Sequence, residues 1–234
     1  MEESDKLAAF EKKIGFRFKD RRYLLQALTH SSYANERKIR KIPDNEHKLK
    51  NDYERLEFLG DAVLELVASH DIFLKNPAMS EGEMSKLRAS LVCEPALAYC
   101  AREISLGRYL FLGKGEMAMG GAERDSILSD AFEAVIGAIY LDSGFTNAKE
   151  FILKYALNDA ETKKLFYDSK TILQEIVQAK GQGKVRYEII EESGPDHSKC
   201  SLDGLETMGK GKTKKAAEQQ AAYKAILSLR TQEE

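Results

Sequence analysis

The sequence has few of the features that mark secreted, zinc-stabilised or membrane-spanning proteins. It contains three cysteines, Cys93, Cys100 and Cys200, and no two of them have the CxxC spacing, so neither a disulfide scaffold nor a structural zinc site is expected. The longest apolar run, residues 134–141, is far shorter than the ~18 residues of a membrane span. Residues 1–10 lack the apolar stretch of a signal peptide. These absences favour a soluble, cytoplasmic protein that does not associate with membranes.

Histidine is sparse and net charge is almost absent. The four histidines, His30, His47, His70 and His197, are scattered, so no metal site built on histidine is expected. The 36 basic and 38 acidic side chains leave a net charge of −2. That sum neither favours nor excludes a charged partner, because local patches matter more. With 43 % hydrophobic residues over 234 positions, the chain can build a core and form one or two domains.

The periodicity of apolar residues changes near residue 160. Residues 1–160 carry helix-period apolar positions and no Val/Ile-rich alternating segment, which predicts an all-α domain. Residues 161–168 are short and mixed, as in a linker. Residues 169–232 suggest a helix at 171–180, a strand at 185–190, a turn at 193–198 and an Ala-rich helix at about 214–229. We therefore predict a second, small α+β domain in this last segment.

Acidic side chains line one face of the helix predicted at residues 52–75. A helical wheel places the acids opposite an apolar face; the acids are Glu54, Glu57, Asp61 and Glu65, and the apolar residues are Leu56, Leu59, Val63 and Leu66. A solvated acidic face is the simplest interpretation. Two details oppose it: like charges at i,i+4 repel, by roughly 0.2–0.5 kcal/mol per pair, and Phe58 falls among the acids. A large aromatic there indicates that a partner surface covers this side.

A second acidic pair, Asp130 and Glu133, has i,i+3 spacing beside the small residues Ala134 and Gly137. The dipole at a helix N-terminus explains Asp130 well and Glu133 less well. Small neighbours would let another backbone, or a ligand, come close to these carboxylates. If the two acidic helices pack together, the dehydrated acids need a cation or raised pKa values. An all-oxygen site suits Mg²⁺ or Mn²⁺, ions that activate water for phosphodiester cleavage.

Several segments resemble bacterial ribonuclease III, in the order expected for that family. Residues 54–66 (ERLEFLGDAVLEL) match its signature segment. The other matching segments are ALTHSSYANE (27–36), EGEMSKLRASL (81–91), GKGE (113–116) and SILSDAFEAVIGAIYLDSG (126–144). Residues past 168 look like a double-stranded-RNA-binding domain, so the resemblance covers essentially the whole chain. It implies a ribonuclease III-like helical nuclease domain at 1–160, a linker at 161–168, and an α-β-β-β-α domain at 169–232.

The resemblance also assigns roles. It implies that Glu57, Asp130 and Glu133 hold Mg²⁺, with Mn²⁺ as a possible substitute, and that Asp61 and Glu133 are most directly tied to catalysis. It gives supporting roles, in the metal site or in RNA contact, to Glu54, Glu81 and Glu116. Phe58 matches a position that packs across the interface of a homodimer. The implied reaction is cleavage of double-stranded RNA to 5′-phosphate and 3′-hydroxyl ends, in processing of ribosomal and other RNA precursors.

Three surfaces of the C-terminal segment match the contacts of a double-stranded-RNA reader, which recognises two minor grooves and the phosphates between them. Gln174 and Glu175 match one minor-groove contact, Pro195 and His197 the second, and Lys214 and Lys215 the phosphate contacts. A solvated loop is the alternative for the lysines. One departure is that residues 200–208 offer only nine positions with weak alternation. We therefore expect a shortened central hairpin, which puts the stability of the sheet in doubt.

The sequence is also compatible with two rival functions. A double-stranded-RNA binder with a degenerate nuclease fold would have lost the acids, whereas Glu57, Asp61, Asp130 and Glu133 are all present. An all-α metal phosphohydrolase acting on nucleotides would leave the RNA-binding segment unexplained, and it usually needs metal-binding histidines. The metal-dependent endonuclease is the favoured hypothesis.

Overall fold

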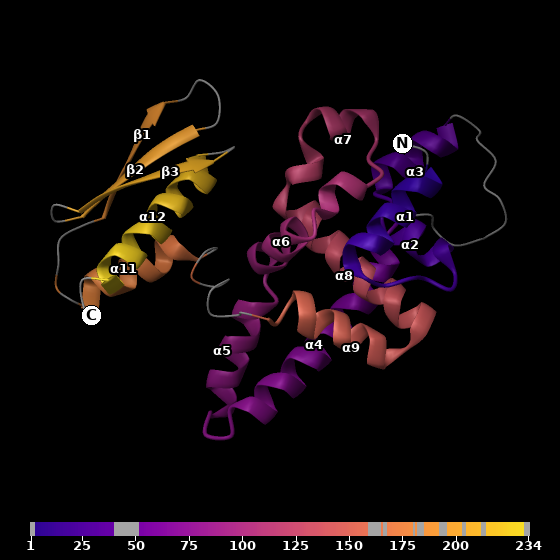
Figure 1. The fold of residues 1–234 in the computed structure, drawn as a ribbon, viewed down its shortest axis with the longest axis horizontal. Helices are drawn as coiled ribbons and strands as arrows, with labels where there is room; N and C mark the ends of the chain where they lie inside the picture. Colours follow the sequence, from indigo (N-terminus) through magenta and orange to yellow (C-terminus); the bar gives the residue numbers. More distant parts are fainter. Residues whose placement is uncertain are drawn as a thin grey trace. The chain divides into compact units, whose positions relative to one another are not determined.

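The computed structural model of the protein describes residues 3–39, 52–158, 165, 168–179, 181, 185–191, 196–202, 205–211 and 214–231. The chain divides into two units, an N-terminal unit of residues 1–158 and a C-terminal unit of residues 159–234. Figure 1 shows helices throughout the first unit, and a sheet with two helices in the second. The predicted fold class, a helical domain followed by a small α+β domain, is confirmed.

The N-terminal unit is built from helices of unequal length. They are α1 (Glu3–Ile14), α2 (Arg21–Ala27), α3 (Ser31–Ile39), α4 (Glu54–Lys75), α5 (Glu81–Leu91), α6 (Glu94–Glu103), α7 (Lys114–Ala118), α8 (Asp125–Ser143) and α9 (Phe145–Tyr155), with 3₁₀ turns η1 (Leu106–Tyr109) and η2 (Gly121–Glu123). None of the helices in the part of the chain that the structure describes is long and apolar enough to cross a membrane.

Local sequence signals begin and end several of these helices. Asp20 caps α2 by accepting a hydrogen bond from the backbone of Arg22. Ser80 and Glu83 form a reciprocal capping box at the start of α5. Gly144 separates α8 from α9 with a φ of 84°, a left-handed conformation that costs glycine little.

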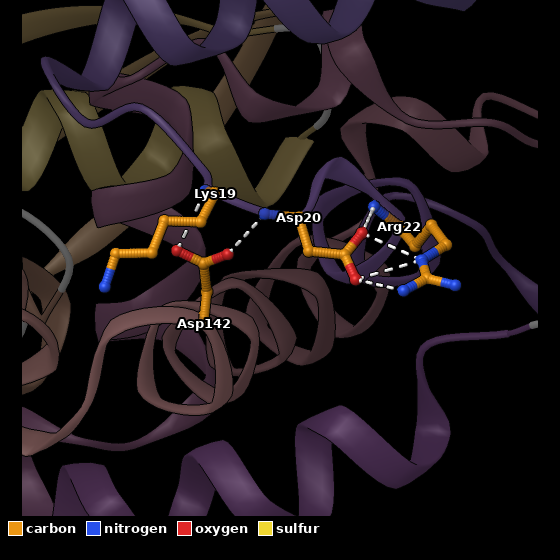
Figure 2. A network of polar contacts seen from close by, with 4 residues as sticks. All are labelled: Lys19, Asp20, Arg22 and Asp142. Carbon is orange, nitrogen blue, oxygen red and sulfur yellow. Dashed lines mark hydrogen bonds and ion pairs between the residues drawn. The ribbon is translucent and has the colours of Figure 1, made fainter.

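Helix α8 is the centre of the N-terminal unit. Its Phe132, Ile136 and Ile139 are fully buried, and its most extensive packing partner is α4. At its last turn, the Asp142 carboxylate accepts hydrogen bonds from the backbone N–H groups of Lys19, at 3.1 Å, and Asp20, at 2.7 Å. Figure 2 shows that this contact continues through Asp20 to Arg22. The segment between α1 and α2 is thereby fixed to one end of the helix that carries the second acidic pair.

The C-terminal unit packs two helices with an antiparallel sheet in the order β1-β2-β3. Its elements are α11 (Ser169–Ala179), β1 (Arg186–Glu191), β2 (Asp196–Leu202), β3 (Leu205–Gly211) and α12 (Lys214–Thr231). The core joins Leu173 and Val177 of α11 to Cys200 of β2 and Ile226 of α12. Leu165, inside the segment expected as a linker, is also buried in this core.

The expected shortening of the central hairpin is wrong. Strand β2 begins at Asp196, inside the predicted turn, and β3 continues to Gly211. The two strands pair without interruption from Asp196↔Gly211 to Leu202↔Leu205. The nine-residue count failed because it took polar residues on both sides of 200–208 to be loop. They form regular strand, since one face of the sheet needs few apolar side chains when the helices cover the other.

Glycine explains how α12 approaches β3 so closely. A Cβ atom added at Gly209 would lie 2.0 Å from the carbonyl oxygen of Ala217, and one at Gly211 would lie 2.5 Å from the backbone nitrogen of Ala217. Only glycine leaves room for this backbone contact. The absence of side chains at these two positions therefore fixes the helix on the sheet.

Candidate active site

Helices α4 and α8 cross with their backbones in contact. A Cβ atom at Gly60 would lie 1.8 Å from the carbonyl oxygen of Glu133, and one at Gly137 would lie 2.3 Å from that of Leu56. Neither helix can carry a side chain at the crossing. The small residues on α8 therefore admit the backbone of α4, one of the two possibilities raised by the sequence. This crossing brings the acidic faces of the two helices together.

Three carboxylates meet beside the crossing. Glu57 of α4 and Asp130 and Glu133 of α8 each offer an oxygen, and these oxygens all lie within 4.8 Å of one another. All three residues are half-buried. Within the described part of the chain, this is the one group of His, Cys, Asp or Glu that could hold a metal ion. It consists of the same three residues to which the family resemblance assigned Mg²⁺.

The environment disfavours the charged forms of these acids. Burial, followed by the negative charges of Asp61, Glu57 and Asp130, raises the pKa of Glu133 to about 8. Burial and the charge of Asp130 also raise the pKa of Glu57, and burial raises the pKa of Asp130. Dehydrated carboxylates at such short separations must bind protons or a cation. Three oxygen donors of this kind fit a hard divalent ion.

The remaining predicted acids lie at different places around this group. Asp61 is exposed on α4, and its charge acts on Glu133 more than any other charge does. Glu54 is exposed in the first turn of α4 and is among the charges that raise the pKa of Glu57. Both therefore border the acidic group.

Glu81 and Glu116 are held by other partners. Glu81 is exposed on α5 and accepts a hydrogen bond of 2.8 Å from the hydroxyl of Ser85. Glu116 of α7 forms an ion pair of 2.9 Å with Arg124. That oxygen of Glu116 is buried, and its contact with Arg124 lacks hydrogen-bond geometry. Neither residue belongs to the group of three carboxylates.

Tyr53, just before α4, is a neighbour of the site that the sequence analysis missed. It is 3 % exposed, and its ring lies edge-on to His30 with centroids 5.6 Å apart. Burial, then the charges of Asp130 and Glu57, raise the pKa of its hydroxyl. The side chain is therefore neutral at physiological pH. No local pattern in the sequence indicated that this ring would be buried beside the acids.

Phe58 projects from α4 with 81 % of its surface exposed. Leu66, expected on the core face, is 58 % exposed as well, because α4 packs through Leu56, Val63 and Val67 and Leu66 lies outside that stripe. Further along the helix, Phe73 is also exposed. The isolated chain thus leaves large apolar side chains of α4 open to a partner.

The RNA-contact residues predicted in the C-terminal unit are described in part. Gln174 and Glu175 are exposed on α11, and Lys214 is exposed at the first position of α12. Lys215 lies in α12 and His197 in β2, but their side chains are outside the described part of the structure, as is the whole of Pro195.

Comparison with known proteins agrees with both units. A family model described as ribonuclease-III-like matches residues 20–160, and one for the double-stranded RNA binding motif matches residues 169–229. Ribonuclease 3 of Bacillus cereus is 47 % identical over 232 residues, covering 95 % of this chain and 91 % of its own length. That of Caldanaerobacter subterraneus is 45 % identical, with 95 % and 98 % covered.

A solved structure also resembles the chain. The nuclease domain of ribonuclease III from Campylobacter jejuni is 41 % identical, with a TM-score of 0.55, covering 63 % of this chain and 93 % of that one. It is described as flexible in a region involved in dimer formation. From the nuclease match, the C-terminal RNA-binding match and the near full-length relatives together, the chain belongs to the ribonuclease III family.

Proposed function

We propose that the protein, an endoribonuclease of this family acting on double-stranded RNA, uses Mg²⁺ held by Glu57, Asp130 and Glu133. The observation that carries this assignment is the meeting of three half-buried carboxylate oxygens within 4.8 Å. Their pKa values are raised, so keeping all three carboxylates charged at this place costs free energy. A divalent cation offsets that cost, and oxygen ligands suit Mg²⁺, with Mn²⁺ as a possible substitute.

The proposed chemistry is hydrolysis of a phosphodiester bond. The bound cation would lower the pKa of a water molecule and stabilise charge on the phosphate. Asp61 is exposed on α4 and its charge acts on Glu133; it would orient the water and accept its proton on a carboxylate oxygen. As the water oxygen bonds to phosphorus, the bond from phosphorus to O3′ would break, and O3′ would take a proton from solvent water while Asp61 later returns its proton to solvent. The products are then a 5′-phosphate and a 3′-hydroxyl.

We assign supporting roles to three further acids. Glu54 borders the cation ligands, and its charge acts on Glu57. Glu116 is fixed by Arg124 and is among the charges that act on Tyr53. Glu81, which is exposed on α5 and bonded to Ser85, suits a contact with RNA better than a contact with the metal.

The C-terminal unit would supply affinity for duplex RNA of any sequence. Gln174 and Glu175 are proposed to read one minor groove and the segment with Pro195 and His197 the next. Lys214 and Lys215 would bind phosphates, helped by the N-terminus of α12. The exposure of Gln174, Glu175 and Lys214 supports this surface.

A homodimer is the proposed assembly, with Phe58 at its interface and one cleavage centre for each RNA strand. The support is an aromatic ring that is 81 % exposed beside the acidic site. The proposed role is processing of ribosomal and other RNA precursors in the cytoplasm, where a bacterium makes these RNAs.

Incubation with a long, perfect RNA duplex tests the proposal. We expect cleavage with Mg²⁺, no cleavage with chelator, and products bearing 5′-phosphate and 3′-hydroxyl ends. Cleavage in chelator would refute the metal assignment. Products with 3′-phosphate or 2′,3′-cyclic ends would refute the proposed bond cleavage.

A further inference from the structure

Arg88 of α5 reaches across to α4 and binds two residues one turn apart. Its Nε lies 2.7 Å from a carboxylate oxygen of Glu65, and its Nη1 donates a hydrogen bond of 2.9 Å to the hydroxyl of Ser69. The Ser69 hydroxyl in turn donates to the carbonyl oxygen of Glu65, at 2.7 Å. The guanidinium is therefore held at a defined place on α4, and Glu65 is held with it.

Glu65 is the last carboxylate of the acidic row on α4, one turn beyond Asp61 and two beyond Glu57. Its charge already contributes to raising the pKa of Glu133. Without the Arg88 guanidinium beside it, the Glu65 carboxylate would add one more uncompensated negative charge near the candidate site. It would compete for the metal ion and repel an incoming phosphate.

Helix α5 has few other anchors. All 11 residues of the helix are described, and Leu91 at its end is the only buried one. Exposed ion pairs contribute little to stability, and the Arg88 and Glu65 side chains are 40 % and 36 % exposed. Stability is therefore not the main consequence of the contact. What the contact fixes is the position of the negative charge of Glu65, which lies on the acidic row of α4 and acts on Glu133.

We propose that Arg88 is a positioning residue of the acidic site, which binds Glu65 and keeps its carboxylate away from the cation and the RNA phosphate. This inference rests on the proposed function, because it assumes that the cation and phosphate meet at Glu57, Asp130 and Glu133. It assigns Arg88 no contact with the substrate. A lysine at this position would keep the charge but could not form both contacts with one planar group.

The test compares Arg88→Gln with the double variant Arg88→Gln/Glu65→Gln in the full-length protein. We expect Arg88→Gln to lower the single-turnover cleavage rate about tenfold at fixed Mg²⁺, as for one uncompensated charge near dehydrated acids. The double variant should recover to within about threefold of wild type, since the harmful carboxylate is gone. Duplex affinity and its salt dependence should stay at wild-type values in both. Arg22→Gln, which breaks the exposed Arg22–Asp20 pair, is the matched control and should cleave normally.

Three results would overturn the inference. One is wild-type cleavage by Arg88→Gln. Another is a double variant as slow as the single one. The third is a flatter salt dependence of binding, which would make Arg88 a direct phosphate contact. Glu133→Ala in the same assay separates this inference from the proposed function. If Glu133→Ala cleaves normally, the site assignment fails; if it is inactive and Arg88→Gln is normal, only the role of Arg88 fails.

Discussion

The two units expose their functional groups to opposite degrees. In the N-terminal unit, Glu57, Asp130 and Glu133 are half-buried and pressed together, and their pKa values are raised. In the C-terminal unit, Gln174 and Lys214 are exposed. The difference agrees with the two proposed tasks. Bond cleavage gains from charges held in a dehydrated place, whereas recognition of RNA grooves and phosphates needs accessible side chains.

Both units nevertheless use glycine to bring backbones into contact. Gly60 and Gly137 let α4 and α8 touch, and Gly209 and Gly211 let α12 lie on β3. In the first unit, the close crossing converts two separate acidic faces into one site. In the second, it fixes α12 on the sheet, with Lys214 exposed at its first position. The same close backbone packing therefore shapes the candidate metal site in one unit and the proposed RNA-binding surface in the other.

The sharpest way to separate the two units is Glu133→Ala. We expect single-turnover cleavage to fall to below about one thousandth of wild type, corresponding to ~4 kcal/mol of barrier, because a cation ligand is lost. Duplex binding should change little, since the C-terminal unit is intact. Single-turnover cleavage and a binding titration measure the two effects. Glu150→Ala, at an exposed position on α9, is the control. Wild-type cleavage by Glu133→Ala at saturating Mg²⁺ would disprove the site assignment.

The second prediction concerns the exposed ring of Phe58 in the N-terminal unit, and Phe58→Asp tests whether it lies at a dimer interface. A charge in a dehydrated interface is costly, so we expect the dimer dissociation constant to rise about a hundredfold, equivalent to ~2.7 kcal/mol. Sedimentation at micromolar concentration measures the mass. Phe145→Asp, an exposed aromatic on α9, should leave the dimer intact. If Phe58→Asp sediments as wild type does, Phe58 is not at the interface.

The acidic site was accessible from the sequence because it depends on helical periodicity. The spacing of Glu57 and Asp61, and of Asp130 and Glu133, fixes which face of each helix carries acid, whatever the rest of the fold does. The contribution of Tyr53 was not accessible, since nothing in the local pattern shows which buried ring will lie beside the acids. The pairing of Arg88 with Glu65 likewise depends on how α5 packs on α4.

The hairpin and Leu66 show where local patterns fail. Polar residues before Cys200 resemble loop, yet they form β2, because strand pairing is decided by the partner strand. Leu66 fits the apolar face on an ideal wheel but is exposed, because contact with α8 covers a narrower stripe. In both cases the outcome depended on neighbours distant in sequence.

Lys214→Ala combined with Lys215→Ala tests whether the C-terminal unit binds the phosphates of duplex RNA through these lysines. Loss of two phosphate contacts should weaken binding to any duplex sequence, by about tenfold near physiological salt. It should also reduce the slope of log affinity against log salt by roughly 1.4–1.8, using a coefficient of about 0.7–0.9 per contact. Lys12→Ala with Lys13→Ala, two exposed lysines at the end of α1, is the matched control. An unaltered slope would rule out Lys214 and Lys215 as backbone contacts.

The smallest expected effect is on the stability of the metal-free protein, and it has a defined sign. The pKa of Glu133 is raised to about 8 in the folded chain, above its ordinary value of 4.5. Between these values the folded state binds more protons than the unfolded state, so the stability contributed by Glu133 falls as pH rises from about 5 to about 8.

Glu133→Gln removes that titration. In chelator at pH 8 it should be more stable than wild type by about 1 kcal/mol, after discounting for partial exposure to water, and at pH 5 the two should unfold alike. Denaturant unfolding at both pH values measures this, with Glu150→Gln as control. Mg²⁺ should stabilise wild type more than Glu133→Gln at pH 8, because only wild type has the full set of ligands. Equal pH dependence in the two proteins would show that Glu133 is well hydrated. Burial would then not distinguish this acid of the N-terminal unit from the exposed side chains of the C-terminal unit.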